Sequence, residues 1–343
     1  MEQSQRRRLD PNDYTVLWIA PLMVEAKACL GVLDEIHQGY FEIHGGQDYI
    51  FSGGKLNGHN IILATFPIGQ NYGTVSAAAL LNQARMVFPT KLTLLVGIAA
   101  GVPRLNPADP KDRRDIRLGD ILVAVPGKTS TGIVQYDLGT ETQRGFTISS
   151  RQAETLSIFR SAYHNIELHY LNPYVEGGAF TAYLHAMQSK LKEKYPEDNF
   201  ECPDWQEDVL YSYVDDNDTE GEIVDRGARN EPERSRIFYG NIGSGNKLMR
   251  NHKERDQLRD IHDLIGLEME AAGIMNYSQA AVIRGVCDYG DRKKNKDWQG
   301  YAAAVAAVYA KAVLMDINPI KPKQAEVSRL LSLRTVPFLA MGT

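Results

Sequence analysis

Acidic and small residues fall where buried strands are expected to end. Glu25 follows an apolar run by a few residues, the segment GIAAG (97–101) closes a second run, and Asp288 ends a third. A fourth segment, GLEMEAAG (266–273), carries two carboxylates two residues apart. Ligands of open α/β sheets bind beyond the carboxyl ends of the strands, so these residues are the first candidates for chemistry.

Asp288 stands directly after the apolar segment VIRGVC. A carboxyl in that position loses contact with water, which favours its protonated form and makes it a plausible proton donor near neutral pH. Arg284 lies four residues earlier on the same strand and could hold a carboxylate in place. The pattern therefore indicates acid catalysis, and a purely structural Arg and Asp pair is the alternative.

The segment LIGLEME places Glu268 and Glu270 on one face, and Met269 on the other, if it is extended. Two carboxylates at a buried strand end are costly without a partner. The vicinal hydroxyls of a ribose are such a partner, because ionised carboxylates accept hydrogen bonds from them. The alternative is a helical surface, where water solvates both carboxylates.

Glu25 and the GIAAG segment are weaker signals. Glu25 opens the helical pattern VEAKACL, where a carboxylate also suits the helix dipole. The small residues Ala99, Ala100 and Gly101 would let backbone amides approach a ligand closely, although any strand-to-helix turn can use such residues.

The elements that must position these residues alternate between strands and helices. Short apolar runs predict strands at 14–21, 60–69, 91–101 and 280–288, with a further strand at 115–126. Helical patterns follow them at 24–36, 74–88 and 300–317. This alternation predicts an α/β fold.

Peripheral segments surround a single domain expected over 14–320. Residues 1–13 are expected to form a flexible tail, and residues 321–343 a C-terminal extension. The stretch 196–236 is acidic and has no periodicity, so it is expected to be a surface insertion or lid, with simple disorder as the alternative.

Composition limits the class of partner. The chain has 343 residues, of which 43% are hydrophobic and 24% charged, and its net charge is −5. These values are typical of a globular protein and argue against nucleic acid or a membrane as partner. Three widely spaced cysteines indicate neither disulfides nor a zinc site, so a cytoplasmic protein is expected, with no metal or cofactor indicated.

These segments together resemble the nucleoside phosphorylase and nucleosidase superfamily, most closely the phosphorylase-like domains of fungal proteins. The similarity runs from Tyr14 to about Ile317 and includes FPIGQNYGTVSAAA, LLVGIAAGVP, DIRLGDILV, GIVQYD, IGSGNKLM, LEMEAAG and IRGVCDYGD, in the family's order. The resemblance implies one α/β domain whose mixed, twisted central sheet is partly barrel-like and flanked by helices.

The resemblance also implies a reaction, the cleavage of the N-glycosidic bond of a purine nucleoside such as adenosine, inosine or guanosine. Asp288 matches the aspartate that contacts the purine, and Glu270 matches the carboxylate that binds the ribose hydroxyls. Met269 would lie beneath the sugar, with Glu268 supporting the site from behind.

Leu248 and Met249 match the turn that packs on the base, although Leu248 replaces an aromatic residue found in some relatives. At the positions where phosphorylases bind phosphate, this chain has Glu25, Leu95 and Ile98. Hydrolytic relatives carry a glutamate where Glu25 falls, as general base on water, and Arg284 would orient it. The resemblance therefore favours hydrolysis, although many hydrolytic relatives keep a serine where Ile98 stands.

Three alternatives stay open. A phosphorylase could recruit phosphate through Arg104, Arg113 or Lys247, and a nucleotide such as ATP could place its phosphates on Arg250 or on Arg292, Lys293, Lys294 and Lys296. The domain could also be a non-catalytic ligand sensor, because similar domains occur in fungal receptor-like proteins. We expect a free-standing enzyme, because the chain ends at Thr343 and contains the set Glu25, Glu270 and Asp288. A homo-oligomer is also expected.

Overall fold

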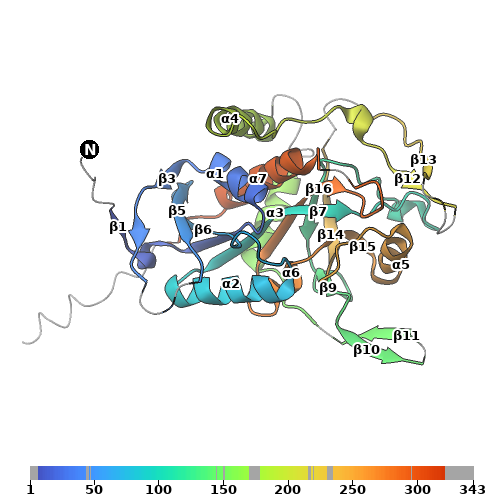
Figure 1. The fold of residues 1–343 in the computed structure, drawn as a ribbon, viewed down its shortest axis with the longest axis horizontal. Helices are drawn as coiled ribbons and strands as arrows, with labels where there is room; N and C mark the ends of the chain where they lie inside the picture. The colour runs from blue at the N-terminus through green and yellow to red at the C-terminus, as the bar shows by residue number, and fades with distance from the viewer. Residues whose placement is uncertain are drawn as a thin grey trace, which may run out of the picture.

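Five strands close into a ring at the centre of the protein (Figure 1). They are β7 (Leu92–Gly101), β8 (Ile121–Ala124), β14 (Ile237–Ser244), β15 (Leu264–Glu268) and β16 (Ala281–Asp288). β16 pairs with β7 and β8, and β14 joins β8 to β15. β15 returns to β7 through two residue pairs near the C-terminal ends of both strands. The expected mixed and partly barrel-like sheet is thus confirmed.

An open sheet continues from β7. It contains, in order, β2 (Val16–Ile19), β6 (His59–Ala64), β5 (Phe51–Leu56) and β3 (Glu35–His37). β9 (Ile133–Gln135) adds to β14. Three small pairs lie outside this sheet: β1 (Arg8–Leu9) with β4 (Tyr40–Phe41), β10 (Gly139–Thr142) with β11 (Gly145–Ile148), and β12 (Tyr211–Ser212) with β13 (Glu222–Ile223).

The structure is a computed structural model that describes residues 7–43, 46, 48–143, 145–149, 151–169, 178–214, 218, 220–229, 235–294 and 296–320. Seven helices flank the strands within these ranges: α1 (Met23–Val32), α2 (Thr74–Val87), α3 (Ser157–His169), α4 (Ala179–Lys194), α5 (His252–His262), α6 (Ala271–Met275) and α7 (Gln299–Met315). Figure 1 shows α1, α4 and α7 on one side of the strands, and α2 with α6 on the other.

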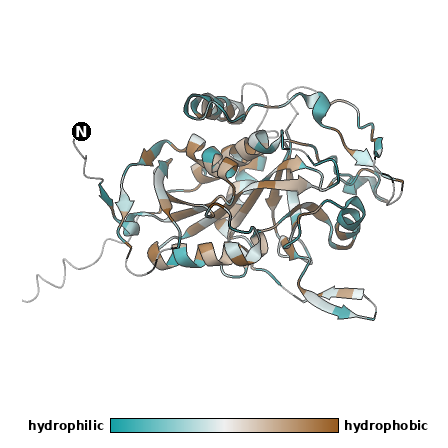
Figure 2. Cartoon of the chain, viewed as in Figure 1, coloured by the Kyte–Doolittle hydropathy of each residue, from teal (hydrophilic) through white to brown (hydrophobic). Residues whose placement is uncertain are grey.

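Helix α7 packs against strands β7 and β16. It is buried from Gly300 to Leu314 apart from Lys311, as expected for a helix that is apolar on all sides. Figure 2 shows the hydrophobic residues concentrated in the central strands, whereas α4 and α5 are mainly hydrophilic. Gly285 of β16 lets α7 lie close, because a Cβ there would overlap the carbonyl oxygen of Ala302. No helix in the described ranges combines the length and apolar character needed to cross a bilayer.

The predicted strands correspond to β2, β6, β7, β8 and β16, and the predicted helices to α1, α2 and α7. Some boundaries are wrong. Helix α1 ends at Val32, and residues 35–37 form β3 rather than the end of the helix. Strand β6 ends at Ala64 and strand β8 begins at Ile121, so both are shorter than predicted. Strand β7 ends at Gly101, as predicted, and its last residues pair with β15.

Part of the acidic stretch 196–236 packs against the loop before β8. Arg229 pairs with Asp120 at 2.6 Å, and Arg226 pairs with Asp115 at 3.6 Å. Both arginine side chains are at most 5% exposed. Buried charges need such partners, so these two pairs anchor this part of the stretch to the domain.

Candidate functional site

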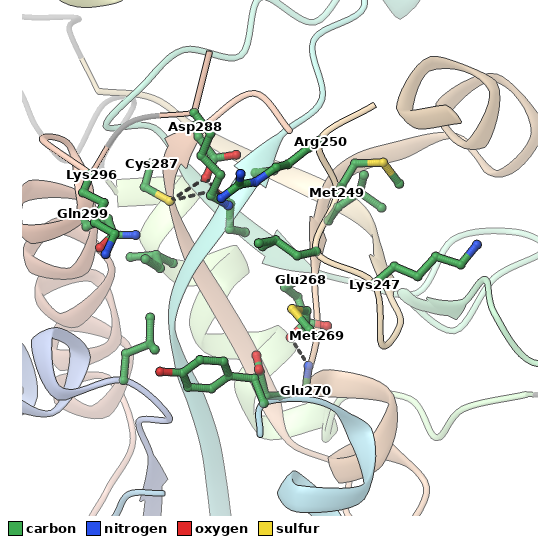
Figure 3. A pocket seen from close by; sticks show the side chains of 18 of the residues that line it. Lys247, Met249, Arg250, Glu268, Met269, Glu270, Cys287, Asp288, Lys296 and Gln299 are labelled. Atoms are coloured by element: carbon green, nitrogen blue, oxygen red, sulfur yellow. Dashed lines mark hydrogen bonds and ion pairs between the residues drawn. The ribbon is translucent and has the colours of Figure 1, made fainter. Parts of the chain in front are cut away.

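A cavity of about 530 Å³ lies at the C-terminal ends of β7, β15 and β16 (Figure 3). Its volume is within the range of small-molecule binding sites. The start of α1 and the loops before α2, after β14 and before α7 complete its wall. Nine of the eleven residues predicted from the sequence line it: Glu25, Ala99, Ala100, Leu248, Met249, Glu268, Met269, Glu270 and Asp288.

The prediction that Gly101 and Arg284 contact a ligand is not supported, because neither lines the cavity. Gly101 pairs with Gly266 in the ring, and a Cβ at Gly101 would lie 2.6 Å from Cγ1 of Val286. Its small size therefore serves the packing of the strands. Arg284 is 1% exposed and lies behind the cavity wall.

Arg284 holds three carboxylates together. Its Nη2 donates to Glu268 and lies 3.1 Å from Oε2 of Glu270, and its Nη1 lies 3.6 Å from Oε1 of Glu25. One cation thus faces three carboxylates, so the cluster has an excess of negative charge when all three are ionised. A negative cluster beside a cavity stabilises positive charge on a bound molecule.

Glu25 is fixed in the first turn of α1. Its Oε2 accepts the Leu22 N–H at 2.7 Å, and its Oε1 accepts the Ile98 N–H at 2.8 Å. Gly97 provides the space, because a Cβ there would overlap Oε1 of Glu25 and lie 2.5 Å from Nη1 of Arg284. Burial raises the pKa of Glu25, against the opposing effect of Arg284 and the two amides. The Ile98 amide of GIAAG therefore binds a protein carboxylate, whereas the segment was predicted to offer its amides to a ligand.

Strand β15 ends at Glu268, so the prediction of an extended LIGLEME is wrong at its end. Glu268 accepts the N–H groups of Glu270 and Ala271 at 3.0 and 2.9 Å, which turns the chain into α6. Glu270 and Met269 face the cavity, with Glu270 at the opposite end from Asp288 in Figure 3. The two glutamates share Arg284 as partner, where a ribose diol was the predicted one.

Burial raises the pKa of Glu270 to about 8, with Arg284 opposing the shift and Glu268 and Glu25 adding to it. The folded protein therefore keeps a proton that the unfolded chain releases above about pH 4.5, and stability falls as the pH rises between these two values. We expect the Tm to fall between about pH 5 and pH 8, and Glu270→Gln to reduce this fall. Thermal unfolding across this range measures the slope, with Glu35→Gln on the surface as control. An unchanged slope in Glu270→Gln would contradict the assignment.

Asp288 closes β16 beside a β-bulge. Val286 pairs with Ala99 and Asp288 with Ala100, so Cys287 is the extra residue, and both Cys287 and Asp288 line the cavity. Oδ1 of Asp288 accepts the Gly290 N–H at 2.8 Å, in a turn where Gly290 has φ of 63°. Nζ of Lys294 lies 2.8 Å from Oδ2. The desolvated carboxyl predicted from the sequence therefore has a cationic partner as well.

The SGN turn carries Leu248 and Met249 to the cavity. Asn246 accepts the Thr74 N–H at 3.0 Å and donates through its side chain to Asp137 at 2.9 Å. These bonds tie the start of α2 to the loop after β14. Met249 is buried, whereas Leu248 is 53% exposed at the cavity.

Some cavity residues were predicted in another role or not at all. Lys247, Arg250, Lys294 and Lys296 line the cavity, although the sequence suggested them only as phosphate contacts. Arg104 and Arg113 do not line it, and Arg104 instead pairs with Asp263 at 2.8 Å. Leu22, Tyr72 and Gln299 also line the cavity and were not predicted. Of these three, Tyr72 alone lies in a recognisable sequence pattern, the NYG turn before α2. No group of His, Cys, Asp and Glu side chains in the described part of the chain is arranged to hold a metal ion.

No protein-family model matches the chain. Its sequence is similar to a nucleotide-binding leucine-rich repeat (NLR)-like protein of Hyaloscypha variabilis, with 34% identity over 330 residues. The match covers 93% of this chain, and the chain spans only 31% of the length of that relative.

Solved structures with a similar fold include a futalosine hydrolase and a nucleosidase. The futalosine hydrolase of Helicobacter pylori has a TM-score of 0.55 and 15% identity, covering 89% of this chain and 98% of that one. The 5'-methylthioadenosine/S-adenosylhomocysteine nucleosidase of Neisseria meningitidis, in complex with methylthio-immucillin-A, has a TM-score of 0.55 and 15% identity, covering 88% and 99%. In its fold as in its sequence motifs, the chain thus resembles the nucleoside phosphorylase and nucleosidase superfamily.

Proposed function

We propose that this chain is a purine nucleosidase, which hydrolyses the N-glycosidic bond of a purine nucleoside to a free base and ribose. The observation that carries the proposal is the presence of Glu25, Glu270 and Asp288 around one cavity. The fold supports it, since the similar structures include nucleosidases and a futalosine hydrolase.

In this proposal the base lies at the Asp288 end of the cavity and the ribose at the Glu270 end, with Met269 beneath the sugar. The departing base leaves positive charge on the ribose ring, which the negative cluster around Arg284 stabilises. Asp288 assists the departure of the purine at N7. Ala99, Ala100, Leu248 and Met249 contact the substrate from the remaining wall of the cavity.

Water is the proposed nucleophile, and Glu25 is the base that removes its proton. A phosphate anion at this place would be repelled by Glu25 and by the carboxylates beside it. Lys247, which lines the cavity and could attract phosphate, is paired with Glu254 at 3.2 Å. These charges favour hydrolysis over phosphorolysis.

A nucleotide is the second candidate substrate. Arg250 and Lys296 line the same cavity and are exposed. Within the described ranges neither side chain has an ion-pair partner, so both could bind the phosphates of a nucleotide.

A product assay tests these proposals together. The protein is incubated with adenosine, inosine, guanosine, uridine or ATP, with and without phosphate, and the base and sugar products are identified by mass spectrometry. We expect free base and ribose from purine nucleosides without phosphate. Ribose 1-phosphate would make the protein a phosphorylase, and release from ATP alone would make it a nucleotide hydrolase. Binding without any product would indicate a ligand sensor. The expected homo-oligomer stays a prediction that the mass in solution checks.

A further inference from the structure

Lys294 and Asp288 form an ion pair on the wall of the cavity. Nζ of Lys294 lies 2.8 Å from Oδ2 of Asp288, and the two side chains are 19% and 3% exposed. Both residues line the cavity at the end of β16. Because little water reaches this carboxylate, each charge depends on the other for compensation.

The pair keeps hydrogen-bonding capacity for a ligand. An ammonium group has three donors, and among the described residues Asp288 is the sole ion-pair partner of Lys294. Asp288 accepts from Gly290 through Oδ1 and from Cys287 through Oδ2, at 2.8 and 3.2 Å. A carboxylate can accept about four hydrogen bonds, so it still has room for one more donor. The cavity wall therefore presents a donor and an acceptor side by side.

We propose that this pair recognises the edge of a 6-aminopurine, with Lys294 donating to N7 and Asp288 accepting from the amino group at C6. Adenine presents the acceptor N7 beside an amino donor, whereas guanine presents two acceptors, N7 and O6. A 6-oxopurine would place O6 against the carboxylate of Asp288, two acceptors without a proton between them. This inference rests on the proposed function and narrows its substrate class.

Lys294 also supplies the proton to N7 of the leaving base, and Asp288 assists this departure by holding the ammonium group of Lys294 in place. When the C1′–N9 bond breaks, its electron pair passes into the purine, and N7 takes a proton from the Lys294 ammonium. Water adds to C1′ and gives a proton to Glu25. Solvent then reprotonates the neutral amine of Lys294 and accepts the proton from Glu25, so the proton count is balanced over one turnover.

A pair of neighbouring lysines gives a matched test. Lys294→Met removes the donor at N7, whereas Lys293→Met changes a residue outside the cavity wall, whose Nζ lies 3.4 Å from Glu220. Loss of one positioned donor lowers kcat about 10²- to 10³-fold, and we expect this loss on adenosine for Lys294→Met alone. Lys294→Arg keeps a cationic donor and should recover part of the rate. Equal activity of Lys294→Met and Lys293→Met would overturn the inference.

Asp288→Asn is a second variant that tests the recognition of the base. The amide of asparagine can donate to O6, so this change should move the ratio of kcat/KM for adenosine over inosine about 10-fold or more toward inosine. An unchanged ratio would overturn the assignment of Asp288 to the amino group. Thermal unfolding of every variant shows whether it is folded.

Binding of free bases tests the inference independently of turnover. Calorimetry should give an affinity for adenine about 10-fold or more above that for hypoxanthine in the unchanged protein and in Lys293→Met. This preference should disappear in Asp288→Asn, whereas Lys294→Met should weaken the binding of both bases, because N7 is an acceptor in each of them. Equal binding of both bases by a protein that hydrolyses nucleosides would overturn the inference and leave the proposed function intact. Selective binding of adenine without hydrolysis would support the recognition of the base and overturn the proposed function.

Discussion

Glu25→Gln should lower kcat for adenosine about 10²- to 10⁴-fold while nucleoside binding changes little. Glutamine has the shape of glutamate but cannot take a proton from water. Release of the base measures turnover, and calorimetry with adenosine measures binding. Because burial raises the pKa of Glu25, the rate of the unchanged enzyme should fall on acidification at a higher pH than an exposed glutamate would give.

Glu25→Gln should also lower the stability of the protein, because Glu25 accepts two backbone hydrogen bonds. Its two oxygens accept the Leu22 and Ile98 N–H groups, and an amide offers only one acceptor. One backbone donor therefore loses its partner, at a cost of about 1–3 kcal/mol in the free energy of unfolding. Assays are run well below the lowered Tm. Parallel losses of binding and turnover would identify Glu25 as a structural residue and contradict its role as a base.

Arg284→Met should destabilise the protein by about 3–5 kcal/mol, because removal of one partner leaves buried charges without compensation. Urea unfolding at neutral pH measures this loss. The control is Arg8→Met, which removes an arginine whose side chain is 65% exposed and pairs with Glu42 at 2.7 Å. An exposed pair of this kind contributes about 0–1 kcal/mol.

Acidification adds a second measurement to Arg284→Met. Protonation of the carboxylates near the missing guanidinium removes their repulsion, so the difference from the unchanged protein should shrink toward about pH 5. A loss of stability equal to that of Arg8→Met at every pH would show that Arg284 does not hold the cluster together.

The strands that end at the site were predictable because their apolar runs stop at charged or small residues, as in β7 and β16. The sequences of β5 and β14, FSGGKL and IFYGNIGS, contain glycines and polar residues that weaken this signal. These segments become strands through pairing with β6 and β8, which a local pattern does not record.

The candidate site was predicted better as single residues than as an arrangement. Glu25, Glu268 and Glu270 were each named from the sequence, and Arg284 was expected to orient Glu25. Only closure of the ring brings all three carboxylates to one guanidinium, since the residues come from separate elements. The contact of Lys294 with Asp288 similarly depends on the turn at Gly290, and the hydrophobic periodicity of the sequence does not predict this contact.

Gly97 links the residue type at position 25 to the residue type at position 97 in any sequence that forms this site. The carboxylate of Glu25 occupies the space that a Cβ at position 97 would need. A glutamate at the first position therefore requires a hydrogen atom as the side chain at the second. Among related chains, the residues at positions 25 and 97 should therefore show whether a carboxylate can occupy this place in the site.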